Sequence, residues 1–184
     1  GAQAAGPWRC RHEPVMTRQL HTAHAAQDGL KAAMLAKHGL TGPRLMLEGE
    51  QGFFAATAPD ADPAAVNATP DAQWLIWETS FKPWPSCRFT HTSIDAALDL
   101  HEQKPDLDDV KEVLIETYTD SAVICDEPVP TSEIQAKFSL QHVVSATLIN
   151  GPPGLDQFRG AALTDSAIAE LRTRCRIAET KQFN

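Results

Sequence analysis

The chain has 184 residues, of which 42% are hydrophobic and 22% charged, a balance that suits one or two compact globular units. Its formal net charge of −8 and its scattered basic residues argue against a nucleic-acid surface. No apolar run approaches the roughly 20 residues of a membrane span, and no charged stretch followed by an apolar one opens the chain. We therefore expect a cytoplasmic protein that binds neither nucleic acid nor membrane.

The first half of the chain predicts one long helix followed by a linker. The first 16 residues show no clear period and are expected to form a loop. Residues 21–38 have the apolar spacing of an amphipathic helix, and Gly39 is a natural residue to end it. The predicted buried stripe of this helix consists of Ala25, Ala26, Leu30, Ala33 and Met34. Prolines between residues 58 and 71 predict a linker with one short helical turn, and we place a domain boundary there.

The second half predicts short strands separated by helices. Residues 73–81 have the pattern of a strand, and residues 90–103 have helical spacing, with Thr90 or Thr92 available as the cap. A second strand is expected at 110–118, with Val113 and Ile115 on one face. The further predicted elements are an apolar helix at 139–150, a helix at 165–174 and a strand at 175–180. Few strands separated by helices predict an α+β fold rather than a doubly wound sheet.

The bend at residues 82–91 gathers a lysine, an arginine and a histidine around two prolines. Each proline fixes its own φ and biases the preceding residue toward extended geometry, so the chain should leave a strand here without entering a helix. Arg88 and His91 should then lie near a helix N-terminus, where backbone N–H groups favour an anion.

The cysteines are widely spaced and form no C-x-x-C pair, which argues against a metal site built from local ligands. They are Cys10, Cys87, Cys125 and Cys175. A disulfide framework is not expected in a cytoplasmic chain of this size. We predict that they are small buried apolar residues, with Cys87 as the exception because it lies in the bend.

The bend and three further segments resemble the MmgE/PrpD family, which includes 2-methylcitrate dehydratase, cis-aconitate decarboxylase and iminodisuccinate epimerase. The first segment is MTRQLHTAHAAQDG at 16–29. The second runs from GLTGP at 39–43 through LEG at 47–49 to GF at 52–53. The third is EIQAKFSLQ at 133–141, followed by an apolar helix and GLDQF at 154–158.

The resemblance implies that the chain is a fragment of a longer protein. Residues 1–58 would be the end of a helical domain, residues 59–71 a linker, and residues 72–184 a truncated small α+β domain. Several acidic and histidine residues of the family's pocket would come from the part that precedes residue 1. The resemblance also implies a homodimer, or association with a helical domain.

Dehydration of a citrate-like substrate requires a base for the proton α to a carboxylate, an acid for the leaving hydroxyl, and cations for the carboxylates. Histidine titrates near neutrality, and lysine and arginine supply the cations. The predicted catalytic residues are Lys82, His91 and His21. The predicted substrate-binding residues are Arg18, Arg88, Lys137, Ser139 and Cys87. No metal and no cofactor are predicted.

Simpler alternatives stay open for several of these residues. A single lysine or arginine is usually a solvated surface charge. The segment that holds Lys137 and Ser139 could simply pack the helix that follows it, and His21 could cap its own helix. Arg18 stands where many family members have lysine, and arginine cannot lose a proton near neutral pH, which weighs against a base role there.

The resulting prediction is a lyase that dehydrates a small di- or tricarboxylate such as 2-methylcitrate by cofactor-free proton abstraction. A dicarboxylate epimerase is an alternative, because it shares the abstraction and returns a proton from the opposite face. A decarboxylase of the cis-aconitate type is disfavoured because Ile124 and Cys125 stand where such members carry a tyrosine. A catalytically inert fragment is the last alternative, and its helix at 139–150 would expose apolar surface to a helical partner.

Overall fold

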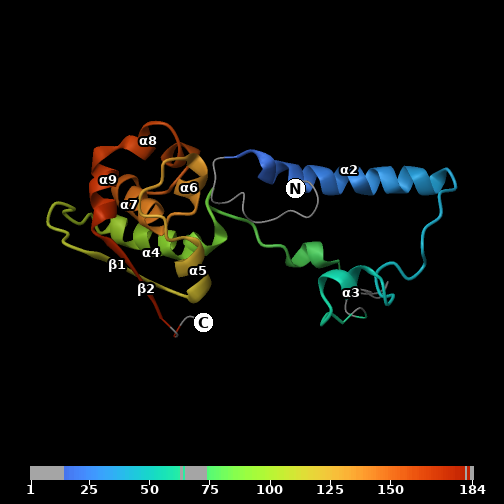
Figure 1. The fold of residues 1–184 in the computed structure, drawn as a ribbon. Coiled ribbons are helices and arrows are strands. Elements are labelled where there is room, and N and C mark those ends of the chain that lie inside the picture. The colour runs from blue at the N-terminus through green and yellow to red at the C-terminus, as the bar shows by residue number, and fades with distance from the viewer. Residues whose placement is uncertain (1–14, 63, 65–73, 181, 183–184) are drawn as a thin grey trace. The chain divides into compact units, whose positions relative to one another are not determined.

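A computed structural model describes residues 15–62, 64, 74–180 and 182 (Figure 1). One compact unit runs from Gln19 to Ser80, and the other holds residues 81–184 together with residues 15–18. Cys10 and most of the predicted N-terminal loop lie outside the described residues, as do residues 63 and 65–73 of the predicted linker. The predicted domain bounds therefore stay a prediction.

The first unit is built on a single long helix. Helix α2 spans Thr17–Lys37, which confirms the predicted helix, and Gly39 follows it with a φ of +91°. A positive φ costs a residue with a side chain free energy, so glycine suits this helix end. Two short elements follow, α3 at Phe53–Thr57 and the 3-10 helix η3 at Leu75–Glu78.

The predicted buried stripe of this helix was wrong. Ala25, Ala26 and Ala33 are exposed, and Leu30 and Met34 are 66% and 55% exposed. Among the described residues of this unit only Gly52 is buried. The spacing of apolar residues favours a helix, but burial also requires a neighbouring element to pack on them, and this unit supplies none within its described part.

The predicted strand at 73–81 was also wrong over residues 74–81. Leu75–Glu78 forms η3, and the backbone hydrogen bonds are local, with Trp77 N donating to Trp74 O at 3.1 Å. Ile76 and Trp77 are 75% and 76% exposed. A strand is stabilised by pairing with a neighbour, and without that pairing the segment satisfies its backbone groups within itself.

The second unit is a packed α+β domain, so the predicted fold class is confirmed. After η4 (Arg88–Thr90), its helices are α4 (His91–Glu102), α5 (Thr119–Ile124), α6 (Glu133–Lys137), α7 (Leu140–Asn150), η5 (Leu155–Phe158), α8 (Ala161–Thr164) and α9 (Ser166–Thr173). The predicted helices at 90–103, 139–150 and 165–174 are confirmed as α4, α7 and α9.

Two parallel strands form the sheet of this unit. β1 (Val113–Thr117) pairs with β2 (Cys175–Glu179), in a register that sets Val113 beside Cys175 and Thr117 beside Glu179. Both strands were predicted. Ile115 is buried and Glu116 exposed, as expected from their alternation.

Helix α7 lies at the centre of the second unit and packs against α4, α6, α9 and β2 (Figure 1). Residues 140–148 are all buried. The apolar surface that the inert-fragment alternative expected on this helix is therefore covered, and that expectation was wrong. At the far end of the helix, Gly151 has a φ of +78°, and His101 Nδ1 donates to Leu148 O at 2.8 Å.

Candidate active site

The proline-rich bend is anchored to the rest of the second unit at both ends. Cys87 N donates to Lys137 O at 2.8 Å, which ties the bend to the end of α6. Trp84 Nε1 donates to Asp95 Oδ1 on α4 at 2.8 Å. These bonds fix the chain at a point where prolines already restrict its backbone.

Thr90 occupies the N-cap position of α4, as predicted, but its side chain makes no capping hydrogen bond. The Thr90 hydroxyl donates to Cys87 O at 2.8 Å, and the Ser86 hydroxyl therefore donates to Thr90 Oγ1, also at 2.8 Å. Thr90 is fully buried. The Thr90 hydroxyl therefore stabilises the bend and does not cap the N-terminus of α4.

A cavity of about 590 Å³ opens at this bend. Its described lining is residues 82–89 of the bend, Ile124 at the end of α5, and Lys137 and Phe138 at the end of α6. Three of these side chains are cationic: Lys82, Arg88 and Lys137. No aspartate or glutamate is among the described residues that line the cavity, so it favours anions.

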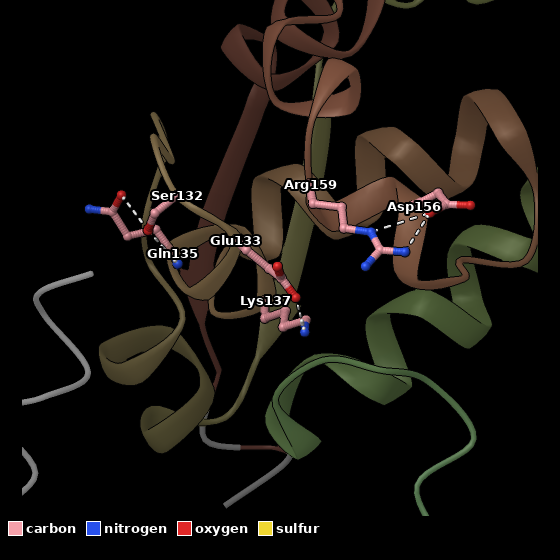
Figure 2. Close-up of polar contacts among 6 residues, drawn as sticks. All are labelled: Ser132, Glu133, Gln135, Lys137, Asp156 and Arg159. Carbon is pink, nitrogen blue, oxygen red and sulfur yellow. Dashed lines mark hydrogen bonds and ion pairs between the residues drawn. The ribbon is translucent and has the colours of Figure 1, made fainter. Parts of the chain in front are cut away.

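The three cations have different partners. Lys82 Nζ donates to Ser86 O at 3.2 Å, and Arg88 Nη1 donates to Phe81 O at 3.3 Å. Lys137 Nζ lies 2.6 Å from Glu133 Oε1 and forms an ion pair with it. Figure 2 shows the Glu133 and Lys137 side chains pointing toward one another from α6.

His91 is buried, contacts Arg88 and is not among the described residues that line the cavity. Arg88 Nη1 lies 3.4 Å from His91 Nδ1, and His91 Nε2 has no hydrogen-bond partner among the described residues. Burial lowers the pKa of His91, and the Arg88 and Lys82 charges lower it further, against the opposing effects of a Ser86 backbone contact and Asp95. The ring is therefore neutral at neutral pH.

The structure places the remaining predicted residues as follows. Cys87 lines the cavity. Ser139 is fully buried at the N-cap of α7, where its hydroxyl accepts from His142 N at 2.9 Å and donates to Glu127 O at 2.6 Å. Ser139 is not among the described lining residues. The predicted substrate role of Ser139 thus lacks contact with the cavity, and its hydroxyl is used in capping.

Two predicted residues lie on α2. His21 is partly buried, and its Nε2 atom has no hydrogen-bond partner among the described residues. The side chain of Arg18 lies outside the described ones. The roles of His21 and Arg18 in one pocket with Lys82 stay predictions.

Glu133 and Trp84 belong to the site but were absent from the predicted site residues. Trp84 lines the cavity, and Glu133 holds one of its cations. The i,i+4 spacing of Glu133 and Lys137 was a signal in the sequence, because side chains at that spacing meet on a helix. It would have identified the pair, although not its place beside a cavity.

A second cavity, of about 640 Å³, lies between α4 and β1 and differs in chemistry. Small and apolar side chains such as Ala96, Ala97 and Val144 line it, and Glu116 is the charged residue among its described lining. This cavity does not suit an anion. The bend is therefore the better candidate for the chemistry that the sequence predicts.

The fold and the cavity at the bend define a small α+β domain with a pocket lined by three cationic side chains. The family model of the MmgE/PrpD C-terminal domain matches residues 84–184, and that of the MmgE/PrpD N-terminal domain matches residues 1–65. The chain belongs to the MmgE/PrpD family, as the sequence motifs predicted.

Two curated relatives extend this comparison. The chain is 28% identical to human cis-aconitate decarboxylase over 168 residues, which are 87% of this chain and 34% of that protein. It is 27% identical to the mouse cis-aconitate decarboxylase over 172 residues, which are 89% of this chain and 35% of that protein. The chain thus spans about a third of the length of the curated relatives it matches.

Proposed function

We propose that this chain supplies the carboxylate-binding part of a lyase site that acts on a small di- or tricarboxylate. The observation that carries the proposal is the cavity at the bend, which is lined by Lys82, Arg88 and Lys137 and by no described carboxylate. Family membership supports the same reading. Arginine binds a carboxylate through two parallel hydrogen bonds, whereas lysine acts as a compact point charge.

In this proposal the cations act on charge that develops during the reaction. Removal of a proton α to a carboxylate leaves an aci-carboxylate with additional negative charge. Lys82 and Arg88 are oriented by backbone carbonyls, which carry no net charge, so both can stabilise that charge. The sequence predicts a catalytic role for Lys82, and we propose that it also protonates the leaving hydroxyl.

The described cavity lining does not supply an evident catalytic base. Among the described residues that line the cavity, none is a histidine or a carboxylate. His91 is neutral at neutral pH and can accept a proton, but it contacts Arg88 and is not among the described lining residues. The proposal therefore assigns the base to His91, with His21 kept as the alternative that the sequence predicts.

Three reactions of a small carboxylate are candidates for this site: dehydration, decarboxylation and epimerisation. Dehydration of a 2-methylcitrate-like substrate is the first candidate that we propose, because it would use the predicted acid, base and cations. The names of the human and mouse relatives favour decarboxylation of cis-aconitate as a second candidate. Ile124, which lines the cavity, stands in the segment where decarboxylase-like members are expected to carry a tyrosine, and this favours dehydration. Epimerisation of a dicarboxylate would use the same first proton abstraction.

The direct test is an assay of the purified chain with 2-methylcitrate, citrate, cis-aconitate and iminodisuccinate. We expect Lys82→Ala to abolish any turnover and Lys111→Ala, an exposed lysine outside the described cavity lining, to leave it unchanged. Solvent deuterium that enters the substrate without elimination would identify an epimerase. A folded chain that neither turns over nor binds any of these carboxylates would contradict the proposal.

Partners and location are part of the same proposal. A homodimer, or association with a helical domain, would supply groups that the described cavity lining lacks, and sedimentation at several concentrations tests it. If the isolated chain binds citrate but converts a substrate only when such a partner is present, the inert-fragment alternative holds for the isolated chain. No helix in the described part of the chain is long and apolar enough to cross a membrane. A cytoplasmic location stays a prediction.

A further inference from the structure

The cationic side chains of the cavity have two kinds of hydrogen-bond partner, neutral backbone carbonyls and a charged carboxylate. Lys82 and Arg88 donate to the carbonyls of Ser86 and Phe81, which carry no net charge. Lys137 instead donates to the Glu133 carboxylate at 2.6 Å. An incoming anion thus meets two cations whose charge is available and a third whose charge is already neutralised.

Glu133 is placed to hold Lys137 without lining the cavity itself. It begins α6 directly after the N-cap Ser132, and Lys137 ends the same helix one turn later (Figure 2). The hydrogen bond from Lys137 lowers the pKa of Glu133, and the charges of Lys137 and Arg159 act in the same direction. Glu133 is therefore anionic at neutral pH.

We propose that Glu133 is an internal counter-ion that competes with substrate carboxylates for Lys137 and so determines which anions the cavity selects. This inference rests on the proposed function and deepens it. A monocarboxylate can use Lys82 and Arg88 alone. A second or third carboxylate gains Lys137 only in competition with Glu133 for its charge, so Glu133 weakens the binding of di- and tricarboxylates relative to monocarboxylates.

The partial exposure of the pair makes this exchange feasible. The Lys137 and Glu133 side chains are 25% and 44% exposed. A carboxylate that leaves such a pair is hydrated by water, and the exchange conserves one ion pair at the lysine. A fully buried pair would not exchange in this way, because the released charge would remain without solvent.

The chain offers a matched control in a second local ion pair. Arg159 Nη2 lies 2.9 Å from Asp156 Oδ1 at i,i+3 spacing, and neither residue is among the described residues that line the cavity (Figure 2). Removing the Asp156 charge changes the net charge of the chain by the same amount as removing that of Glu133. It leaves Lys137 paired, so Asp156→Asn separates the local effect from a general charge effect.

The test is titration of the full chain with citrate by calorimetry and with acetate by NMR. We expect Glu133→Gln to tighten citrate binding by roughly threefold, the size expected for a partly exposed ion pair, with little change for acetate. Asp156→Asn should leave both affinities unchanged. In a Lys137→Met background, Glu133→Gln should no longer affect citrate, and Lys137→Gln serves as a second background variant.

Three outcomes count against the inference and are distinguishable. If the wild-type chain binds citrate and Glu133→Gln binds it equally or more weakly, Glu133 does not compete for Lys137, while the proposed function stands. If the folded wild-type chain binds no citrate, the proposed function and this inference fail together. A purely helix-stabilising Glu133 would lower the melting temperature of Glu133→Gln without changing the ratio of citrate to acetate affinity, which also counts against the inference.

Discussion

The two compact units of this chain differ in how their apolar side chains are covered. In the second unit, Ile94, Leu140 and Val143 are fully buried. In the first unit, Leu30 and Trp77 are 66% and 76% exposed. Both units contain regular helices, so local sequence is sufficient for a helix in each of them. Burial, and with it most of the folding free energy, therefore depends on neighbouring elements that pack against the apolar side chains.

The difference matters for the candidate site because the cavity lies in the packed unit. Lys82, Arg88 and Lys137 project from a bend and a helix end that are bonded to α4 and to each other. Their relative positions are therefore set by a core. His21 belongs to α2 in the unit with little burial, and its approach to any substrate depends on contacts beyond that unit.

The largest difference between the two units is expected from a matched pair of leucine truncations. We expect Leu140→Ala, in the core of the second unit, to lower the free energy of unfolding by about 2–5 kcal/mol, because it leaves a cavity among buried side chains. Leu30→Ala on α2 should change it by less than about 0.5 kcal/mol, because that side chain is exposed. Urea denaturation followed by circular dichroism measures both. Equal losses would mean that α2 is as well packed as α7.

The pH dependence of stability tests the packing of the second unit at His142, which is fully buried on α7. Burial lowers the pKa of His142, the Arg172 charge on α9 lowers it further, and the hydrogen bond to Gln157 O opposes them. The unfolded chain therefore binds more protons than the folded one below about pH 6.5, the ordinary histidine value, so stability falls as the pH drops through that value. The slope per histidine is at most about 1.4 kcal/mol per pH unit.

We expect His142→Gln to reduce this slope. His91, whose pKa is also lowered, should retain its own contribution, so part of the slope remains. Urea midpoints between about pH 7.5 and about pH 5.5, on either side of the ordinary histidine value, provide the measurement. An unchanged slope in His142→Gln would show that its ring is protonated equally in both states.

A pair of serine substitutions tests the helix ends of the second unit. Ser139→Ala removes the cap of α7 and the donor to Glu127 O, and we expect a loss of about 1–2 kcal/mol in the free energy of unfolding. Ser132→Ala removes the longer bond from Gln135 N at 3.3 Å on the short helix α6, and should cost about 0.5 kcal/mol. If Ser139→Ala also weakened citrate binding in the folded state, the substrate role predicted for Ser139 would regain support.

Most of the second unit could be predicted from sequence because its signals are local. The caps Ser139 and Asp165 and the alternation around Ile115 are interpretable without knowledge of distant residues. The segment at 74–81 failed because its aromatic and β-branched residues favour a strand only where a partner strand is present. The buried stripe of α2 failed for a related reason, since a pattern of apolar residues does not specify what covers it.

The candidate site was predictable in its cations and less so in its base. The proline pair and the family motif identified Lys82, Arg88 and Lys137, which the fold brings to one cavity. The absence of His91 from the described cavity lining could not be predicted, because one helical turn decides which of two neighbouring side chains faces the cavity. The ion pair of Lys137 could be inferred from spacing, but its competition with substrate depends on a cavity that only the fold creates.

The last pair of substitutions concerns the bend where the packed unit begins. Trp84→Phe keeps an aromatic ring against the core but removes the donor to Asp95 Oδ1, and we expect a loss of about 0.5–1.5 kcal/mol, the net value of one hydrogen bond. Trp77→Phe, in the exposed part of the first unit, should have no measurable effect. Asp95→Asn retains an acceptor and should behave closer to the wild type than Trp84→Phe does. Because the same bend positions Lys82 and Arg88, Trp84→Phe should also weaken citrate binding. A loss of stability without weaker binding would show that the prolines alone hold the cations in place.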